Sequence, residues 1–315
     1  MADSSSGRVA ETRRHPLLVE LGIRLVKEKP LGTVGAVITL LLLFTGIFAD
    51  FLAPYGMNEN VGALLAPPSA KFWLGTDNIG RDLLSRVIFG ARISVIVGLA
   101  TPTLGTLISV MIGLISGYIG GKFDLVAQRF VDAWMCFPGL MVVMVIISII
   151  KPGVLQVIIV LSLLFGINGS RIIRGAVIGI KGNLYVEAAR AIGCSTTRIL
   201  TRHILPNIMG PTLMMFSGRV SEAILAEAAL SFLGFGIPPP FPSWGGMLSG
   251  NSRTYMFQAP WLAIWPGLAL AAVVYGTNMF GDAVRDILDP RLRGGVGRYG
   301  VRVRSKNEPS TQAIK

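Results

Sequence analysis

Long apolar stretches alternate with shorter polar ones along most of this 315-residue chain. An apolar run of about 20 residues is long enough to cross a lipid bilayer as an α-helix. The pattern therefore predicts an all-α integral membrane protein with six transmembrane helices. Their expected ranges are 31–53, 92–118, 128–150, 154–173, 212–235 and 261–280.

The composition agrees with a protein that crosses the membrane several times. Hydrophobic residues make up 52% of the chain and charged residues only 15%, whereas a soluble domain averages about 25% charged residues. The net charge is +12. Basic residues of membrane proteins gather on the cytoplasmic side, and no basic module with stacking aromatics stands apart from the spans. We therefore interpret the charge as a topology signal and not as nucleic-acid binding.

The distribution of lysine and arginine predicts which segments lie inside the cell. Residues 1–30 and the basic residues 285–315 are expected to be cytoplasmic tails, and 54–91 an external segment. Residues 92–284 are expected to form a core of five transmembrane helices with one large cytoplasmic loop at 174–211. The external segment is more basic than this rule predicts, and its Asp77 and Asp82 are available to pair with those charges.

The stretch 185–211, YVEAARAIGCSTTRILTRHILPNIMGP, is polar and basic between two apolar blocks. It opens with strong helix formers, continues through a glycine that suits a positive φ, and ends in an apolar series closed by proline. We predict two short amphipathic helices that meet at the glycine. The residues that carry the pattern are Glu187, Ala188, Ala189, Arg190, Gly193, Leu205 and Pro206.

This stretch resembles the cytoplasmic EAA loop of the permease subunits of bacterial ABC importers, in which Glu-Ala-Ala is followed by Gly and then by Leu-Pro. The run LGTDNIGRDLLSR at 74–86 resembles the corresponding segment of the dipeptide, oligopeptide and nickel subfamily. LAEAALSFLGFG and GDAVRDILDPRLR resemble that subfamily as well. The resemblance covers residues 70–293 and implies the six-span fold of type I ABC importer permeases. An ordinary charged loop is the alternative interpretation of the 185–211 stretch.

The resemblance also implies partners and a location. It implies a heterodimer with a second homologous permease, two cytoplasmic ATPase subunits and an external solute-binding protein. The complex would lie in the bacterial inner membrane with both termini of this chain cytoplasmic. Glu187 and Arg190 would be polar contacts of the EAA loop with an ATPase, and Ala188 and Ala189 its close-packing face.

No catalytic role is expected for the chain itself. Its sequence contains no phosphate-binding loop, no nucleophile–base group and no set of metal ligands. Mg-ATP is therefore expected only in the partner ATPases, and no cofactor or metal in this chain.

Several polar residues inside the expected spans are candidates for a translocation path: Arg219, Glu222, Glu227, Asn168 and Asp132. Charges in a span are costly, so they face a bundle interior, a water-filled cavity or one another. Arg219 and Glu222 stand at i,i+3 and could pair. Three interpretations remain open: a paired structural role, a polar lining of the path, and a proton relay.

The external parts and the cargo leave alternatives as well. The 74–86 segment could be a folded cap that orients the second span, or a contact for the solute-binding protein. Trp244, Trp261 and Trp265 fit an aromatic belt at the membrane interface. Di- and oligopeptides are the favoured cargo, with nickel, glutathione and opines as alternatives. An ion-driven secondary transporter, which would predict inverted repeats, and a membrane enzyme are the rival classes.

Overall fold

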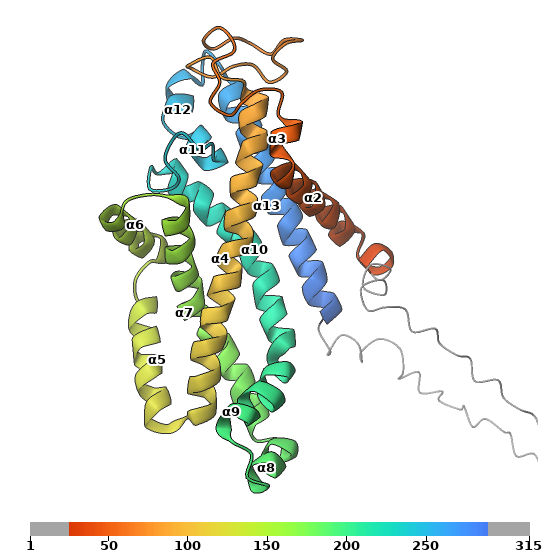
Figure 1. Ribbon diagram of the computed structural model, residues 1–315, viewed down its shortest axis with the longest axis vertical. Coiled ribbons are helices and arrows are strands. Elements are labelled where there is room, and N and C mark those ends of the chain that lie inside the picture. Colours follow the sequence, from red (N-terminus) through yellow and green to blue (C-terminus); the bar gives the residue numbers. More distant parts are fainter. Residues whose placement is uncertain (1–24, 289–315) are drawn as a thin grey trace, which may run out of the picture.

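A computed structural model describes residues 25–288 of the chain (Figure 1). The expected tails at 1–24 and 289–315 lie outside the described residues. Between residues 25 and 288 the regular elements are helices, and β-type pairing is limited to two isolated bridges, Asn60–Arg81 and Thr76–Asp82. The helices are α2 (Pro30–Ile47), α3 (Ala49–Leu52), α4 (Leu83–Ile119), α5 (Gly121–Met135), α6 (Gly139–Ile150), α7 (Val154–Lys181), α8 (Leu184–Ala191), α9 (Thr196–Arg198), η1 (Ile199–Ile204), η2 (Leu205–Ile208), α10 (Met209–Phe232), α11 (Trp244–Leu248), α12 (Asn251–Tyr255) and α13 (Trp261–Leu288). The prediction of an all-α membrane protein is confirmed.

The number of membrane spans is less clear-cut than the hydrophobic pattern indicated. Among the described residues, α2, α4, α7 and α13 are long and apolar enough to cross a membrane. The pair α5 and α6 adds a fifth candidate if the two are counted as one span. Helix α10, the expected fifth span, is not among them; it carries Arg219, Glu222 and Glu227 in its 24 residues. Length and composition therefore support four or five spans, and not yet six.

The expected third span, 128–150, is not one straight helix. Helix α5 starts already at Gly121, seven residues before the expected start of the span, and ends at Met135. Helix α6 starts at Gly139, directly after Pro138, and the two axes differ by 86°. Proline has no amide hydrogen and disfavours helical geometry in the residue before it, which explains a sharp break at this position.

Helices α4 and α7 pack most closely, through small residues (Figure 1). A Cβ atom added to Gly113 would lie 2.6 Å from the carbonyl oxygen of Ser170, so a larger residue would push the helices apart. The hydroxyl of Ser109 donates to the carbonyl of Gly166 over 2.8 Å. The spacing Gly113-x-x-x-Gly117 in the sequence predicts a close helix contact of the kind that is typical of helices in membranes, and the structure confirms it.

The first and last long helices, α2 and α13, pack along one side of this pair (Figure 1). A Cβ atom on Gly35 would lie 2.5 Å from the carbonyl oxygen of Gly276, which again requires a glycine. The ammonium group of Lys29 pairs with Asp286 over 2.6 Å, so the start of α2 and the end of α13 are joined. Helix α10 packs between α13 and α4.

The two ends of the bundle differ in what they hold (Figure 1). The upper end in that view holds the connection 53–82 with α3, α11 and α12, and the lower end holds α8 and α9. Helix α4 begins at Leu83 and not at Arg92, because the Asp82 carboxylate accepts from the Ser85 amide over 2.8 Å and caps the helix. Residues 83–91, the last part of the predicted external segment, therefore belong to α4.

Trp244 is not part of an exposed aromatic belt. Its side chain is 3% exposed, and its indole Nε1–H donates to the carbonyl of Val87 over 3.0 Å. A Cβ atom on the neighbouring Gly245 would lie 2.1 Å from the carbonyl oxygen of Ala228. The indole is buried because α11 packs against both α4 and α10. Helix α11 thereby connects the upper end to the bundle.

Candidate functional site

The segment 184–208 folds into the two short helical parts that the sequence predicts. Helix α8 ends at Ala191, and Gly193 follows with φ +81°, a conformation that favours glycine. Ser195 then caps α9 by accepting from the Arg198 amide over 3.4 Å. The chain continues as a π-helical turn and a 3-10 turn that contains Pro206, and it enters α10 at Met209.

One face of this segment is buried against the bundle. Val186, Ala189, Ile199, Ile204 and Ile208 pack with Ile173 and Val177 of α7 in one buried cluster. The segment is thus seated on α7, with Leu114 and Tyr118 of α4 at its edge. Because of this buried contact, the segment should move together with α7 and α4 and not as a free loop.

The opposite face of α8 exposes apolar side chains. Leu184 is 83% exposed and Ile192 is 80% exposed, with the exposed Ala188 between them at helical spacing. Glu187 and Arg190 are exposed beside this stripe. The two alanines do not form one packing face, since Ala189 points into the bundle and only Ala188 points outward. We call Leu184, Glu187, Ala188 and Ile192 the coupling face.

Three of the five path candidates, Asp132, Arg219 and Glu222, form ion pairs on α5, α7 and α10. Asp132 of α5 pairs with Arg171 of α7. Arg219 of α10 donates to Glu222 over 2.6 Å, so the pairing predicted from their spacing is confirmed. The Arg219 guanidinium also lies over the Phe165 ring of α7, 4.8 Å from its centroid.

Asn168 lies in the same part of α7, and its Oδ1 is buried without a hydrogen-bond partner among the described residues. The indole nitrogen of Trp134, at the end of α5, is likewise buried without a hydrogen-bond partner among the described residues. Buried polar atoms are normally satisfied by protein or water. We call Asn168 and the two ion pairs, Asp132–Arg171 and Arg219–Glu222, the polar band.

Glu227 lies apart from the polar band. It is 1% exposed, and the Ser231 hydroxyl donates to its Oε1 over 2.6 Å. The Ser243 side chain, from the connection between α10 and α11, also hydrogen-bonds to it. Ser231 in turn accepts from the Ile237 amide over 3.1 Å. Glu227 therefore holds the upper connection onto α10, a position that favours the structural interpretation of this carboxyl group.

Two further arginine–carboxylate contacts lie outside the five path candidates, and the sequence indicated pairing only for Asp77. At the lower end, Arg174 of α7 forms a two-pronged pair with Asp124 of α5, with 2.6 Å between Nε and Oδ1. At the upper end, Arg81 and Arg86 both face Asp77. Asp77 and Arg81 are four residues apart, so their pairing could be suspected from spacing alone, whereas Asp124 and Arg174 are fifty residues apart.

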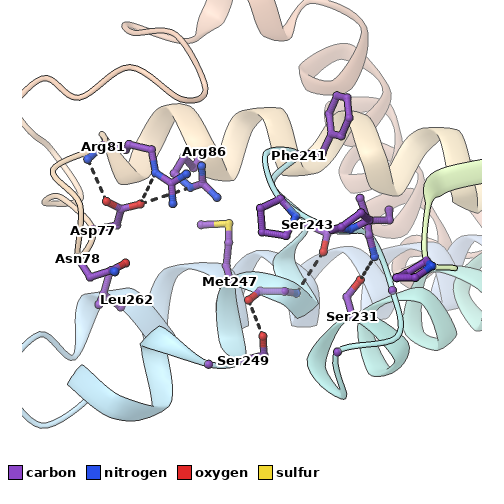
Figure 2. A pocket seen from close by; sticks show the side chains of 18 of the residues that line it. Asp77, Asn78, Arg81, Arg86, Ser231, Phe241, Ser243, Met247, Ser249 and Leu262 are labelled. Carbon is purple, nitrogen blue, oxygen red and sulfur yellow. Dashed lines mark hydrogen bonds and ion pairs between the residues drawn. The ribbon is translucent and has the colours of Figure 1, made fainter. Parts of the chain in front are cut away.

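The contact at the upper end lines a pocket of about 340 Å³ (Figure 2). Its wall comes from the 77–86 segment, from Pro152 between α6 and α7, and from residues 231–262. Figure 2 shows the guanidinium groups of Arg81 and Arg86 side by side, with Ser243 and Phe241 on the other part of the wall. All three upper connections of the bundle thus meet at this pocket.

Residues 109–294 match the family described as binding-protein-dependent transport system inner membrane component. The chain belongs to this family. It is therefore a multi-pass membrane component of a binding-protein-dependent ABC importer, a class that works with ATPase and solute-binding partners. The resemblance inferred from the EAA loop and the 74–86 segment is confirmed.

Individual relatives extend the match over most of the chain. The oligopeptide transport system permease protein OppC of Bacillus subtilis is 37% identical over 268 residues, which cover 85% of this chain and 88% of that protein. The dipeptide transport system permease protein DppC of the same organism is 34% identical over 294 residues, 92% of both. The glutathione transport system permease protein GsiD of Pectobacterium atrosepticum is 36% identical over 256 residues, 81% of this chain and 85% of that protein.

Proposed function

We propose that this chain is one of two permease subunits of an ATP-driven importer of di- and oligopeptides. In this proposal it has the six-span type I fold, with α5 and α6 together as the third span and α10 as the fifth. The packing of α10 supports this, because two of its polar residues, Ser221 and Glu227, face protein. The Ser221 hydroxyl bonds to Asn278 of α13 over 2.6 Å, and Glu227 is buried beneath the upper connection.

The upper end is external and the lower end cytoplasmic in this proposal. The lower end carries the basic residues of the 184–208 segment, as the positive-inside rule expects. Several cations of the upper end are neutralised by carboxylates, since Arg81 and Arg86 face Asp77 and Arg92 pairs with Asp50 over 2.6 Å. The Lys29–Asp286 pair holds the two described ends of the chain together, so both tails would leave on the cytoplasmic side.

The coupling face is the observation that carries the proposal. An exposed apolar stripe on a short helix, seated firmly on α7, is suited to bind a groove of an ATPase and to pass on its motion. Two such ATPases would bind and hydrolyse Mg-ATP, and this chain would be non-catalytic. The contact residues would come from Glu187, Ala188, Arg190 and the flanking apolar side chains, while Gly193, Leu205 and Pro206 shape the segment.

The polar band would line the translocation path in a heterodimer with a homologous permease. Asp132 is 39% exposed, Arg171 44% and Glu222 56%, which is costly for charged groups in contact with lipid. A water-filled path between two permeases would hydrate these groups. Asn168 would lie behind that lining, since its Oδ1 is buried.

The cargo is proposed from the relatives, two of which are named for oligopeptide and dipeptide transport. Glutathione is the second candidate, because a relative of similar identity is named for it. Both are short peptides with free carboxylates, so one transport experiment can compare them.

The test is purification of the tagged chain from its own membranes in mild detergent, followed by reconstitution. We expect two ATPases with phosphate-binding loops and a second permease to co-purify. With the solute-binding protein added, vesicles should take up labelled trialanine only in the presence of Mg-ATP. A chain that purifies alone and transports without ATP would refute the proposal, and ATP-driven uptake of glutathione alone would reassign the cargo.

A further inference from the structure

The carboxylate of Asp77, which lines the pocket at the upper end, already accepts several hydrogen bonds. Asp77 Oδ1 accepts from the amides of Ile79 and Arg81, each over 2.9 Å. Asp77 Oδ2 accepts from Arg81 Nε over 2.7 Å and lies 3.7 Å from Arg86 Nε. A carboxylate with this many donors has little capacity left for a cation, so the pocket does not offer a cation site.

The two guanidinium groups, in contrast, have N–H groups in excess. Each guanidinium carries five N–H donors, and Arg81 and Arg86 share the single carboxylate of Asp77. Arg86 Nη1 also donates to the carbonyl of Met57 over 3.0 Å. Arg81 Nη1 and Arg86 Nη1 also reach Asn58 Oδ1, over 3.5 and 3.4 Å, which leaves most of their ten N–H groups unused. The nearby Asp82 does not compete, because its Oδ2 accepts from the Ser85 amide and hydroxyl, over 2.8 and 2.7 Å.

Both arginines are largely withdrawn from solvent. The Arg81 side chain is 15% exposed and the Arg86 side chain 10%. Charge-assisted hydrogen bonds are stronger in such surroundings than on an open surface. An anion that enters the pocket would therefore meet donors that are held in place and poorly hydrated.

The rest of the wall is apolar or already hydrogen-bonded. Pro238, Pro239 and Phe241 form part of it. The Ser231 and Ser243 hydroxyls accept from the amides of Ile237 and Gly246, each over 3.1 Å. A volume of about 340 Å³ is at the lower end of the range of about 300–1,000 Å³ for small-molecule pockets. The complementary ligand is small, with one carboxylate and an apolar body.

We propose that this pocket binds the free C-terminal carboxylate of a short peptide, held by Arg81 and Arg86. The proposal rests on the peptide transport proposed above and adds a cargo site on the permease itself. The site lies where the three upper connections meet, on the side from which cargo arrives. An acidic side chain of the solute-binding protein would present the same carboxylate, and the experiment separates the two sources.

The experiment uses the purified transporter with its partner subunits in nanodiscs, without the solute-binding protein. Binding of trialanine, of trialanine amide and of N-acetylglutamate amide is titrated by saturation-transfer NMR. Arg81→Gln removes one guanidinium, and Lys71→Gln is the matched control. Lys71→Gln removes the same charge from the same segment. The Lys71 side chain is exposed, lies over the Phe72 ring and does not line the pocket.

We expect trialanine to bind wild type and Lys71→Gln equally, and Arg81→Gln at least tenfold more weakly. The amide should bind wild type at least tenfold more weakly than trialanine, a comparison that needs no variant to fold. Absence of trialanine binding, equal binding of the amide, or unchanged binding to Arg81→Gln would each refute the site. Binding of N-acetylglutamate amide without trialanine would refute it in favour of an acidic side chain of the binding protein. ATP-driven uptake of trialanine by the complete transporter, measured in parallel, shows whether the proposed function stands if the site fails.

Discussion

The guanidinium group of Arg190 lies over the ring of Tyr118, with 5.7 Å between Arg190 Cζ and the ring centroid. Tyr118 belongs to the end of α4 and Arg190 to α8, whose buried face packs against α7. The contact therefore attaches the coupling face to both helices of the closest-packed pair. A force on α8 would reach α4 and α7 together, as a rigid-body movement requires.

Removal of the Tyr118 ring should weaken this attachment. A cation–π contact at a partly exposed site contributes about 0.5–1 kcal/mol, so Tyr118→Leu should lower transport-coupled ATPase activity by about two- to fivefold. Tyr118→Phe keeps the aromatic face and should match wild type. The measurement is ATP hydrolysis by the reconstituted transporter with and without solute-binding protein. Equal activities of the Leu and Phe variants would show that the stacking does not contribute to coupling.

Gly193 should be needed for the partner contact more than for the fold. An added Cβ atom meets nothing within 4 Å, so a side chain has room in the isolated chain. Its φ of +81° would strain other residues by about 1 kcal/mol. Gly193→Asp should therefore reach the membrane in normal amounts but lose its ATPases during purification.

Gly193→Asn is the control for backbone strain, because asparagine has the size of aspartate, tolerates positive φ and adds no charge. It should retain more ATPase than Gly193→Asp. Normal ATPase recovery together with normal uptake in Gly193→Asp would disprove the coupling role of this segment.

The sequence predicts features of this protein that depend on local chemistry. The Glu187–Arg190 helix, the turn at Gly193 and the Ser195 cap follow from residue types within one or two helical turns. The glycines at 113 and 117 predict a close helix contact for a similar reason, since only small residues allow two helices to approach so closely, but they do not predict that α7 is the partner.

Features that depend on distant partners could not be predicted. The burial of Trp244 depends on the Val87 carbonyl in α4. The hydrogen bonding of the buried Glu227 carboxyl group depends on Ser243, in the connection to α11. Phe137–Pro138 predicts a kink in the third span, but neither the proline nor the apolar run predicts a bend as large as 86°. Neighbouring residues of a helix cannot share one face, but which of Ala188 and Ala189 is buried depends on where α7 lies.

The buried position of Glu227 predicts different effects for two substitutions. Glu227→Gln keeps the shape and one carbonyl oxygen that can accept from Ser231, so thermal stability and uptake should stay within about twofold of wild type. Glu227→Ala leaves a cavity and unsatisfied hydroxyls, and should cost about 2–4 kcal/mol. Thermal unfolding in detergent and trialanine uptake test both variants. A Gln variant that folds normally but does not transport would instead indicate a role for the ionisable carboxyl group.

The Asp124–Arg174 pair predicts that α5 is fixed to α7 at the lower end by a measurable interaction. The Asp124 side chain is 14% exposed and the Arg174 side chain 31%, and two nitrogens of the guanidinium contact the carboxylate. A double-mutant cycle with Asp124→Asn and Arg174→Gln should give a coupling energy of about 1–2 kcal/mol, above the range of about 0.2–1 kcal/mol for exposed pairs.

The Arg129–Asp132 pair on α5 itself supplies the comparison. Its closest nitrogen and oxygen are 3.7 Å apart, and Arg129 is 75% exposed. The same cycle there should give no more than about 0.5 kcal/mol, because water screens the charges and the long side chain loses entropy when it is held. Unfolding free energies of the four variants in each cycle are the measurement. Equal coupling in the two cycles would show that the lower contact between α5 and α7 is not held by this ion pair, and α5 would then be free to move relative to α7 during transport.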